Sequence, residues 1–212
     1  MDYLFAALLS TESPQLPAPW LAHLYLSLGW GLVLAAFAAA GLRRRNPWHP
    51  RGRAWLPLAL LLLCLLPGSL SPAYWLGLAF RAPSGLFTLL CAWALWCHYR
   101  PQAPAVPLEG MWGIAWVLVA AGWALLLDTF AVLPVGLYAA GFAPLTLGVL
   151  VLLGLLPWLL RGATSLSVLL VGACVLHVAL RLPSGNVWDA LLDPWLWLLL
   201  QGAALRRALQ RH

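Results

Sequence analysis

Residues 30–66 read WGLVLAAFAAAGLRRRNPWHPRGRAWLPLALLLLCLL, in which a short basic segment separates two apolar blocks. The run Leu58–Leu66 is wholly apolar and does not alternate with polar residues, as a transmembrane strand would. A helix needs about 20 apolar residues to cross roughly 30 Å of hydrocarbon, and each block extends to nearly that length. The pattern therefore predicts membrane-spanning helices joined by a basic loop.

The whole chain has the same character. Of its 212 residues, 63% are hydrophobic and 8% are charged, whereas about 25% charged residues is usual in soluble domains. All of the basic residues are arginines, and most of them flank apolar blocks, so the net charge of +6 indicates topology signals beside anionic headgroups. We expect membrane lipids as partners and no nucleic-acid ligand.

The apolar blocks predict an all-α, polytopic transmembrane helix bundle of about seven spans, forming a single domain over residues 1–212. The spans are expected at about residues 20–42, 54–80, 85–99, 111–132, 135–160, 165–182 and 186–205. Pro67-Gly68-Ser69 interrupts the second block, and Asp193-Pro194 predicts a kink or a later start in the seventh. If the short third segment is re-entrant, six spans remain.

The arginines also predict orientation. The loop Arg43–Arg53 carries five of them, which places it in the cytoplasm by the positive-inside rule. The N-terminus then lies outside and, with seven spans, the C-terminus lies inside. A proline-rich cytoplasmic linker at residues 101–110 divides the domain into halves at residues 1–100 and 111–212. We expect a multi-pass protein of a bacterial inner membrane.

The phrase Arg-x-Pro-Ser-Gly occurs at Arg81–Gly85 and again at Arg181–Gly185. Proline stops the incoming helix, glycine permits a turn, and serine can cap the outgoing helix. The recurrence indicates an internal duplication, and such repeats are common in transporters. Two arginines beside two helix starts at the outer face predict a site for an anion or lipid headgroup, formed by Arg81, Ser84, Arg181 and Ser184. Alternatively, each arginine reaches the interface and pairs with a nearby carboxylate.

Four further ionisable residues lie within or beside the apolar spans, namely Asp128, His177, Asp189 and Asp193. A charged group in hydrocarbon is costly, and so it suggests a function. The alternatives are that Asp128 is a solvated helix end at the membrane rim, and that Asp193 satisfies backbone groups freed by the following proline.

Two histidines lie at similar predicted depths below the outer face. His23 and His177 are therefore candidate axial ligands of a b-type haem, or alternatively hydrogen-bonded packing residues. The motifs Gly-x-Ser-x-Gly and His-Glu-x-x-His are missing, and the cysteines lack the spacing of a zinc site. We therefore predict no resident cofactor, no metal and no catalytic residue, with haem as the alternative.

The leading functional hypothesis is a non-catalytic component of a membrane transport or envelope complex, associated with other membrane subunits, or a small solute or lipid transporter. Small residues such as Gly136, Ala139, Ala140 and Gly141 suit close helix contacts. One alternative is an intramembrane enzyme acting on a phosphate-bearing lipid at the outer face, with the two motif arginines binding phosphate. Another is a haem-binding electron-transfer subunit.

Overall fold

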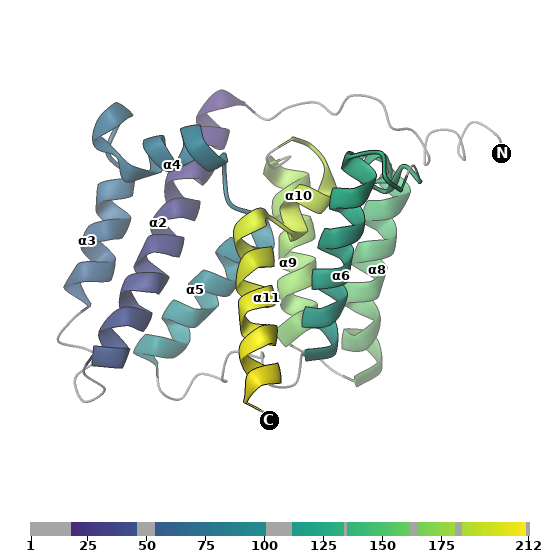
Figure 1. Cartoon of the computed structure of the whole chain (residues 1–212). Helices are drawn as coiled ribbons and strands as arrows, with labels where there is room; N and C mark the ends of the chain where they lie inside the picture. Colours follow the sequence, from purple (N-terminus) through teal and green to yellow (C-terminus); the bar gives the residue numbers. More distant parts are fainter. Residues whose placement is uncertain are drawn as a thin grey trace. The chain divides into compact units, whose positions relative to one another are not determined.

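The computed structural model describes residues 18–45, 54–100, 112–133, 135–161, 165–180 and 184–210. Within these ranges every regular element is helical and no strand occurs, which confirms the all-helical prediction (Figure 1). The chain separates into two compact units. The N-terminal unit holds the described residues of Pro17–Pro83 and Phe87–Val106, and the C-terminal unit holds those of Ser84–Leu86 and Pro107–His212.

The N-terminal unit is built around a long helix, α2 (Pro19–Arg45), which packs along α3 (Trp55–Cys64) (Figure 1). Gly31 permits this contact, because a Cβ atom there would lie 2.8 Å from Leu61 Cδ1. A larger residue would force the two helices apart. The close approach of apolar helices through a small residue is the packing expected inside a membrane.

The interruption predicted in the second apolar block is present. A 3₁₀ turn, η2 (Gly68–Leu70), separates α3 from α4 (Pro72–Phe80). The Ser71 hydroxyl donates to the Cys64 carbonyl oxygen at 2.8 Å and accepts from the Ala73 amide at 3.1 Å. One side chain thus satisfies a donor and an acceptor that the break would otherwise leave unpaired. Helix α5 (Gly85–Tyr99) follows α4 along the chain.

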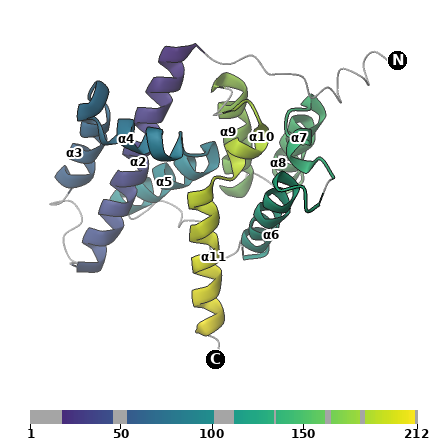
Figure 2. The same cartoon turned by 45° about the horizontal axis from the view of Figure 1, so that its top comes forward.

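The described residues of the C-terminal unit after position 111 form six helices: α6 (Trp112–Thr129), α7 (Leu137–Ala140), α8 (Pro144–Arg161), α9 (Ser165–Leu180), α10 (Val187–Leu191) and α11 (Pro194–Leu209). Helix α8 packs on α9, and α6 packs on α11. Figure 2 shows these helices from a second direction. A glycine lies at each of these two helix contacts. A Cβ atom on Gly154 would lie 2.8 Å from Val171 Cγ2, and Gly122 lies against the indole of Trp197. The indole nitrogen of Trp197 also donates to the Val119 carbonyl oxygen at 3.1 Å.

Two of the predicted spans are divided in the structure, the fifth against expectation and the seventh at the predicted kink or later start. The fifth was expected to be continuous from residue 135, but α7 and α8 are separate helices, and Gly136 adopts a left-handed φ of 73°. The seventh is divided into α10 and α11, because Asp193 caps a new helix that starts at Pro194. The chain before α7 joins the hydrogen-bonded network described below, and the break before α11 supplies a separate contact between Asp193 and Ser84.

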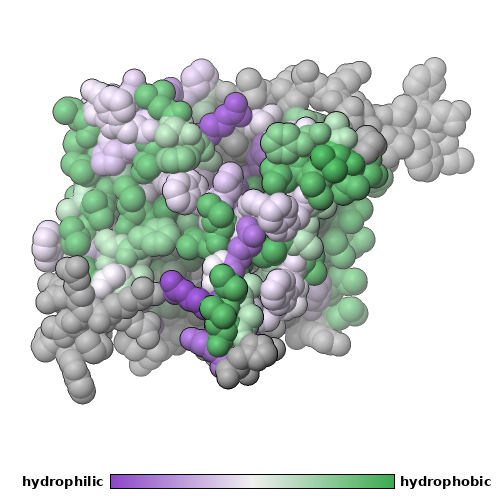
Figure 3. Space-filling model, viewed as in Figure 1, coloured by the Kyte–Doolittle hydropathy of each residue, from purple (hydrophilic) through white to green (hydrophobic). Residues whose placement is uncertain are grey.

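Two helical segments are long and apolar enough to cross a membrane. These are Pro19–Leu42, with a mean hydropathy of 1.7, and Trp112–Thr129, with a mean hydropathy of 1.5. Only 6% of the second segment is buried within the protein, so most of its apolar surface faces the surroundings. Figure 3 shows apolar side chains, in green, exposed along the helices. These features favour a membrane protein, because a soluble protein rarely exposes apolar patches of this extent.

Candidate functional site

Polar side chains of the C-terminal unit meet in one hydrogen-bonded network, which we call the Asp128–Asp189 network. It joins the end of α6 to α7 and to the segment that precedes α10. Its members are Asp128, Tyr138, Ser184, Asn186 and Asp189. The network thus brings together three of the residues that the sequence singles out, Asp128, Ser184 and Asp189.

Asp128 organises the chain that follows it. Its Oδ1 atom accepts hydrogen bonds from the backbone amides of Val135 at 3.1 Å and Gly136 at 2.8 Å. Its Oδ2 atom accepts a hydrogen bond from the backbone amide of Tyr138 at 2.9 Å. Several amides converging on one carboxylate stabilise its charge and also hold the first turn of α7. The left-handed φ of 73° at Gly136 lets the chain turn back toward this carboxylate.

Tyr138 connects α7 to the second part of the network. Its hydroxyl donates to Asp189 Oδ2 at 3.0 Å, and the Ser184 hydroxyl donates to the same oxygen. The Tyr138 carbonyl oxygen accepts from Asn186 Nδ2 at 2.8 Å. A single residue therefore joins two segments that lie about fifty positions apart along the chain.

Asn186 connects the segment before α10 both to α7 and to α10 itself. Its Oδ1 atom accepts the amide of Trp188 at 3.0 Å and so caps α10. Gly141 lies directly against this side chain, and a Cβ atom there would collide with Asn186 Oδ1. The amide of Val187 donates to the Gly141 carbonyl oxygen at 3.0 Å. Gly141, predicted to serve close helix contacts, thus makes a contact within its own unit.

Asp193 forms a second polar contact and is the buried carboxylate of this unit's described residues, with 8% of its surface exposed. Its Oδ1 atom accepts the amide of Leu196 at 2.6 Å, which caps α11, and its Oδ2 atom accepts the amide of Ser84 at 2.6 Å. The Ser84 hydroxyl also hydrogen-bonds to this carboxylate. Beside it, a Cβ atom on Gly85 would lie 3.2 Å from the Ala190 carbonyl oxygen. Asp193 therefore holds Ser84 beside the start of α11 within the C-terminal unit.

The predicted anion site is only partly described. Arg181 lies outside the described residues, so its partners are not defined. Arg81 is exposed and adopts a φ of 60°. Its carbonyl oxygen accepts a hydrogen bond of 2.8 Å from the indole N–H of Trp30. Ser84 has 0% of its surface exposed, and Ser184 donates to Asp189. Both serines thus hydrogen-bond to carboxylates of their own unit.

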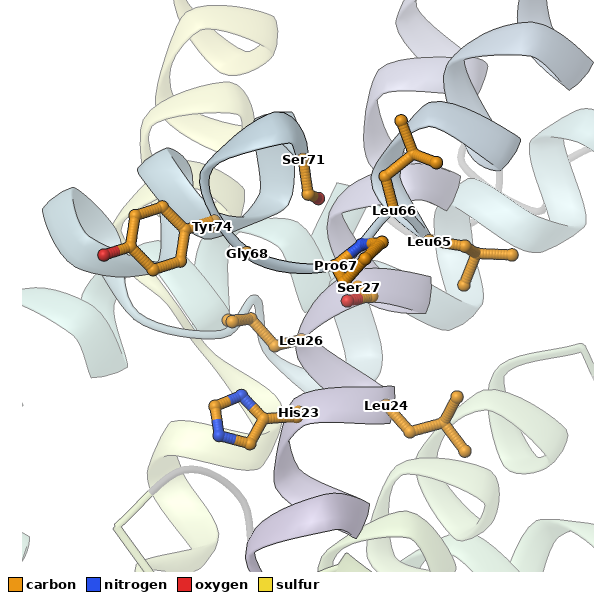
Figure 4. A pocket seen from close by; sticks show the side chains of 10 residues that line it. All are labelled: His23, Leu24, Leu26, Ser27, Leu65, Leu66, Pro67, Gly68, Ser71 and Tyr74. Carbon is orange, nitrogen blue, oxygen red and sulfur yellow. The ribbon is translucent and has the colours of Figure 1, made fainter.

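The two histidines lie in different units. His177, on α9, is buried with 2% of its surface exposed, whereas His23, on α2, is exposed. His23 lines a cavity of about 310 Å³ in the N-terminal unit (Figure 4). The other lining residues are Leu24, Leu26, Ser27, Leu65, Leu66, Pro67, Gly68, Ser71 and Tyr74. The described walls are mostly apolar, with a few polar side chains and no carboxylate, which suits an organic ligand better than a metal ion.

No group of three or more histidine, cysteine or acidic side chains with the arrangement of a metal site occurs within the described ranges. Tyr138 and Asn186 were missed by the sequence analysis. Asn186 follows a glycine and precedes an apolar segment, the usual position of a helix cap, and this signal would have identified it. The chain matches no protein-family model, and no curated protein or solved structure is significantly similar to it.

Proposed function

We propose that the chain is a non-catalytic, multi-pass component of a bacterial inner-membrane transport or envelope assembly. In this proposal its apolar segments make seven spans, with the N-terminus outside and the C-terminus inside. The low charge content, the two helices of membrane-spanning length and the exposed apolar helix surfaces support a membrane location. Arg43–Arg53 supports the orientation, because cytoplasmic loops are enriched in arginine.

One observation favours a structural role over catalysis. Asp128 and Asp193 accept backbone amides, and Asp189 accepts two hydroxyl groups, so each carboxylate binds groups of its own unit. A general acid or base must instead reach a proton on a bound substrate. The carboxylates give the ends of the helices a fixed shape, as expected of a protein that presents a defined surface to neighbouring subunits.

The exposed surface of α6 is one part of the fold suited to such a neighbour. Val117 is 65% exposed and Trp116 is 55% exposed, whereas Ala115, on the opposite face, is buried. Helices associate in membranes through packing of such exposed faces. A contact between α6 and a neighbouring subunit should therefore involve Val117 and not Ala115.

Photo-crosslinking in native membranes tests this proposal. A photoreactive residue at Val117 should crosslink the chain to another membrane protein, and the same residue at Ala115 is the matched control. Blue-native electrophoresis in mild detergent should show the chain in a larger complex. A chain that migrates as a monomer and crosslinks only to lipid from Val117 would contradict the proposal.

The orientation is tested separately by labelling. With Cys64, Cys91, Cys97 and Cys174 replaced by alanine, a single cysteine at Trp48 should react with a membrane-impermeant maleimide only after the cytoplasmic face is opened. Labelling of intact cells or spheroplasts at this position would reverse the proposed topology.

The alternative of an intramembrane enzyme is tested by Asp128→Asn. Loss of cellular function in a variant that folds and accumulates normally would support an acid–base role. If the carboxylate only organises α7, function should fall in step with the amount of folded protein. A lipid-handling function is the second candidate, and it is favoured by the groove along α11 described next.

A further inference from the structure

A groove runs along α11 in the C-terminal unit, with a volume of about 740 Å³. Among the described residues, its wall comprises one residue of α6, six of α11 and the C-cap of α11, namely Trp112, Leu198, Leu199, Gly202, Ala203, Arg206, Arg207 and Gln210. The positions on α11 and its C-cap follow a spacing of three and four residues, so they lie on one face of the helix. We call this surface the α11 groove.

The α11 groove changes character along its length. Leu198 and Leu199 make its first part apolar, the small residues Gly202 and Ala203 leave space in the middle, and the last turn carries two guanidinium groups. Figure 3 shows hydrophilic side chains, in purple, beside apolar ones near the C-terminal end of α11. A cationic end and an apolar stem on one continuous surface match an amphipathic anion.

The cationic end is open to a ligand. Arg206 is exposed, and Arg207 lies with its guanidinium carbon 4.4 Å from the centre of the Trp112 ring. The described part of the chain contains no carboxylate paired with either group. The stacked indole holds Arg207 while its N–H groups stay available, and a planar guanidinium binds phosphate in bidentate fashion.

The dimensions agree with one leaflet of a bilayer. Leu198 and Gln210 are twelve residues apart, which corresponds to about 18 Å along a helix. Half of a bilayer, headgroups included, is roughly 20–22 Å thick. In the proposed topology the arginine end lies at the cytoplasmic surface, where basic pockets between helices bind anionic headgroups.

We propose that the α11 groove binds an anionic phospholipid of the surrounding bilayer, with its phosphate on Arg206 and Arg207 and an acyl chain along Leu198, Leu199 and Gly202. This rests on the proposed membrane location. The site differs from the outer-face site predicted around Arg81 and Arg181, because it lies at the opposite end of the spans and uses other arginines.

Two variants separate the headgroup contact from the acyl contact. Arg206→Gln with Arg207→Gln removes both charges, and Arg100→Gln, an exposed arginine of the N-terminal unit, is the control for charge loss. Gly202→Leu fills the groove without a clash, because no atom lies within 4 Å of a Cβ built there. Gly148→Leu on α8 is the matched control, since its Cβ position is equally open.

Native mass spectrometry of the detergent-purified protein, titrated with phosphatidylglycerol or phosphatidylcholine, measures the binding. Wild-type protein should bind phosphatidylglycerol at least about tenfold more tightly than phosphatidylcholine, because the phosphatidylglycerol headgroup has a net negative charge, whereas in phosphatidylcholine the choline ammonium offsets the phosphate charge and is repelled by the two guanidinium groups. The double arginine variant should lose this preference, Gly202→Leu should lose binding of both lipids, and both controls should behave as wild type.

Equal binding of the two lipids, or an unchanged preference in the double arginine variant, would overturn the proposal. Binding of glycerol 3-phosphate as tightly as phosphatidylglycerol would also overturn it, because the acyl chain would then contribute nothing. Recovery of the chain as a soluble, detergent-free monomer would refute the membrane location itself. These outcomes distinguish failure of the lipid site from failure of the proposed function.

Discussion

Replacement of Asp193 should destabilise the C-terminal unit more than replacement of any other described carboxylate. Its two oxygens accept the amides of Leu196 and Ser84, each at 2.6 Å, and the side chain is 8% exposed. In Asp193→Ala both acceptors are lost at once. The α11 cap disappears, and the Ser84 amide is left without its acceptor in a buried position.

The size of the effect follows from these two losses. Loss of a helix cap costs about 0.5–2 kcal/mol, and a buried donor without an acceptor costs about 1–3 kcal/mol. Asp193→Ala should therefore lower the free energy of unfolding by about 2–5 kcal/mol, a decrease in Tm of roughly 5–20 °C for a chain of this length. Asp193→Asn keeps one acceptor oxygen, so its loss should be about 1–3 kcal/mol.

Asp189→Asn is the matched control. Asp189 accepts hydroxyl groups, both on Oδ2, and the oxygen of an asparagine amide can accept them in the same way. Thermal unfolding in detergent, followed by tryptophan fluorescence and circular dichroism, should place this variant within about 4 °C of wild type. If Asp193→Ala unfolds within about 2 °C of wild type, or if Asp189→Asn is the more damaged variant, the assigned role of Asp193 is wrong.

Three further predictions concern other parts of the fold. Gly141→Ala should lower the Tm, because the added methyl group collides with the neighbouring asparagine side chain, whereas Gly148→Ala should be neutral or stabilising; equal Tm values would contradict this contact. Asp128→Ala releases the amides of the following loop, so limited proteolysis should cleave between α6 and α7 in the variant before wild type, and identical cleavage patterns would show that the carboxylate does not hold the loop. The purified protein should show no Soret band in its absorption spectrum; a band that disappears in both His23→Ala and His177→Ala would establish the haem alternative instead.

The sequence predicted the elements that depend on local pattern. The helical segments followed from apolar runs, and the break before α4 followed from Pro67-Gly68-Ser69. The new helix after Asp193 followed from an acidic residue before a proline, which is a helix-start signal. In each case the deciding residues are neighbours in the chain, so that no knowledge of distant contacts is needed.

The remaining features depend on contacts between distant residues. The loop between α6 and α7 is held by amides that donate to Asp128, a contact between residues seven to ten positions apart that the apolar run does not reveal. The break between α7 and α8 precedes Pro144, a proline at a helix start that the sequence analysis did not use. The partner of the Ser84 amide lies 109 positions away. Asp128, Asp189 and Asp193 were recognised as unusual from their apolar surroundings, but their partners required the three-dimensional structure.

The pairing of Ser84 with Asp193 has a consequence for how the chain is made. Ser84–Leu86 belongs to the C-terminal unit although it precedes most of that unit in the sequence. At about 5–20 residues per second, a ribosome needs roughly 5–20 s to add the 109 residues that separate the Ser84 amide from its acceptor. During that interval Ser84–Leu86 must remain accessible, so that it can dock when its acceptor is made. A fragment that begins at the 101–110 linker would lack Ser84–Leu86 altogether. Dividing the gene at this linker should therefore yield two incomplete products, whereas a cut just before Ser84 would keep the docking segment with its acceptor.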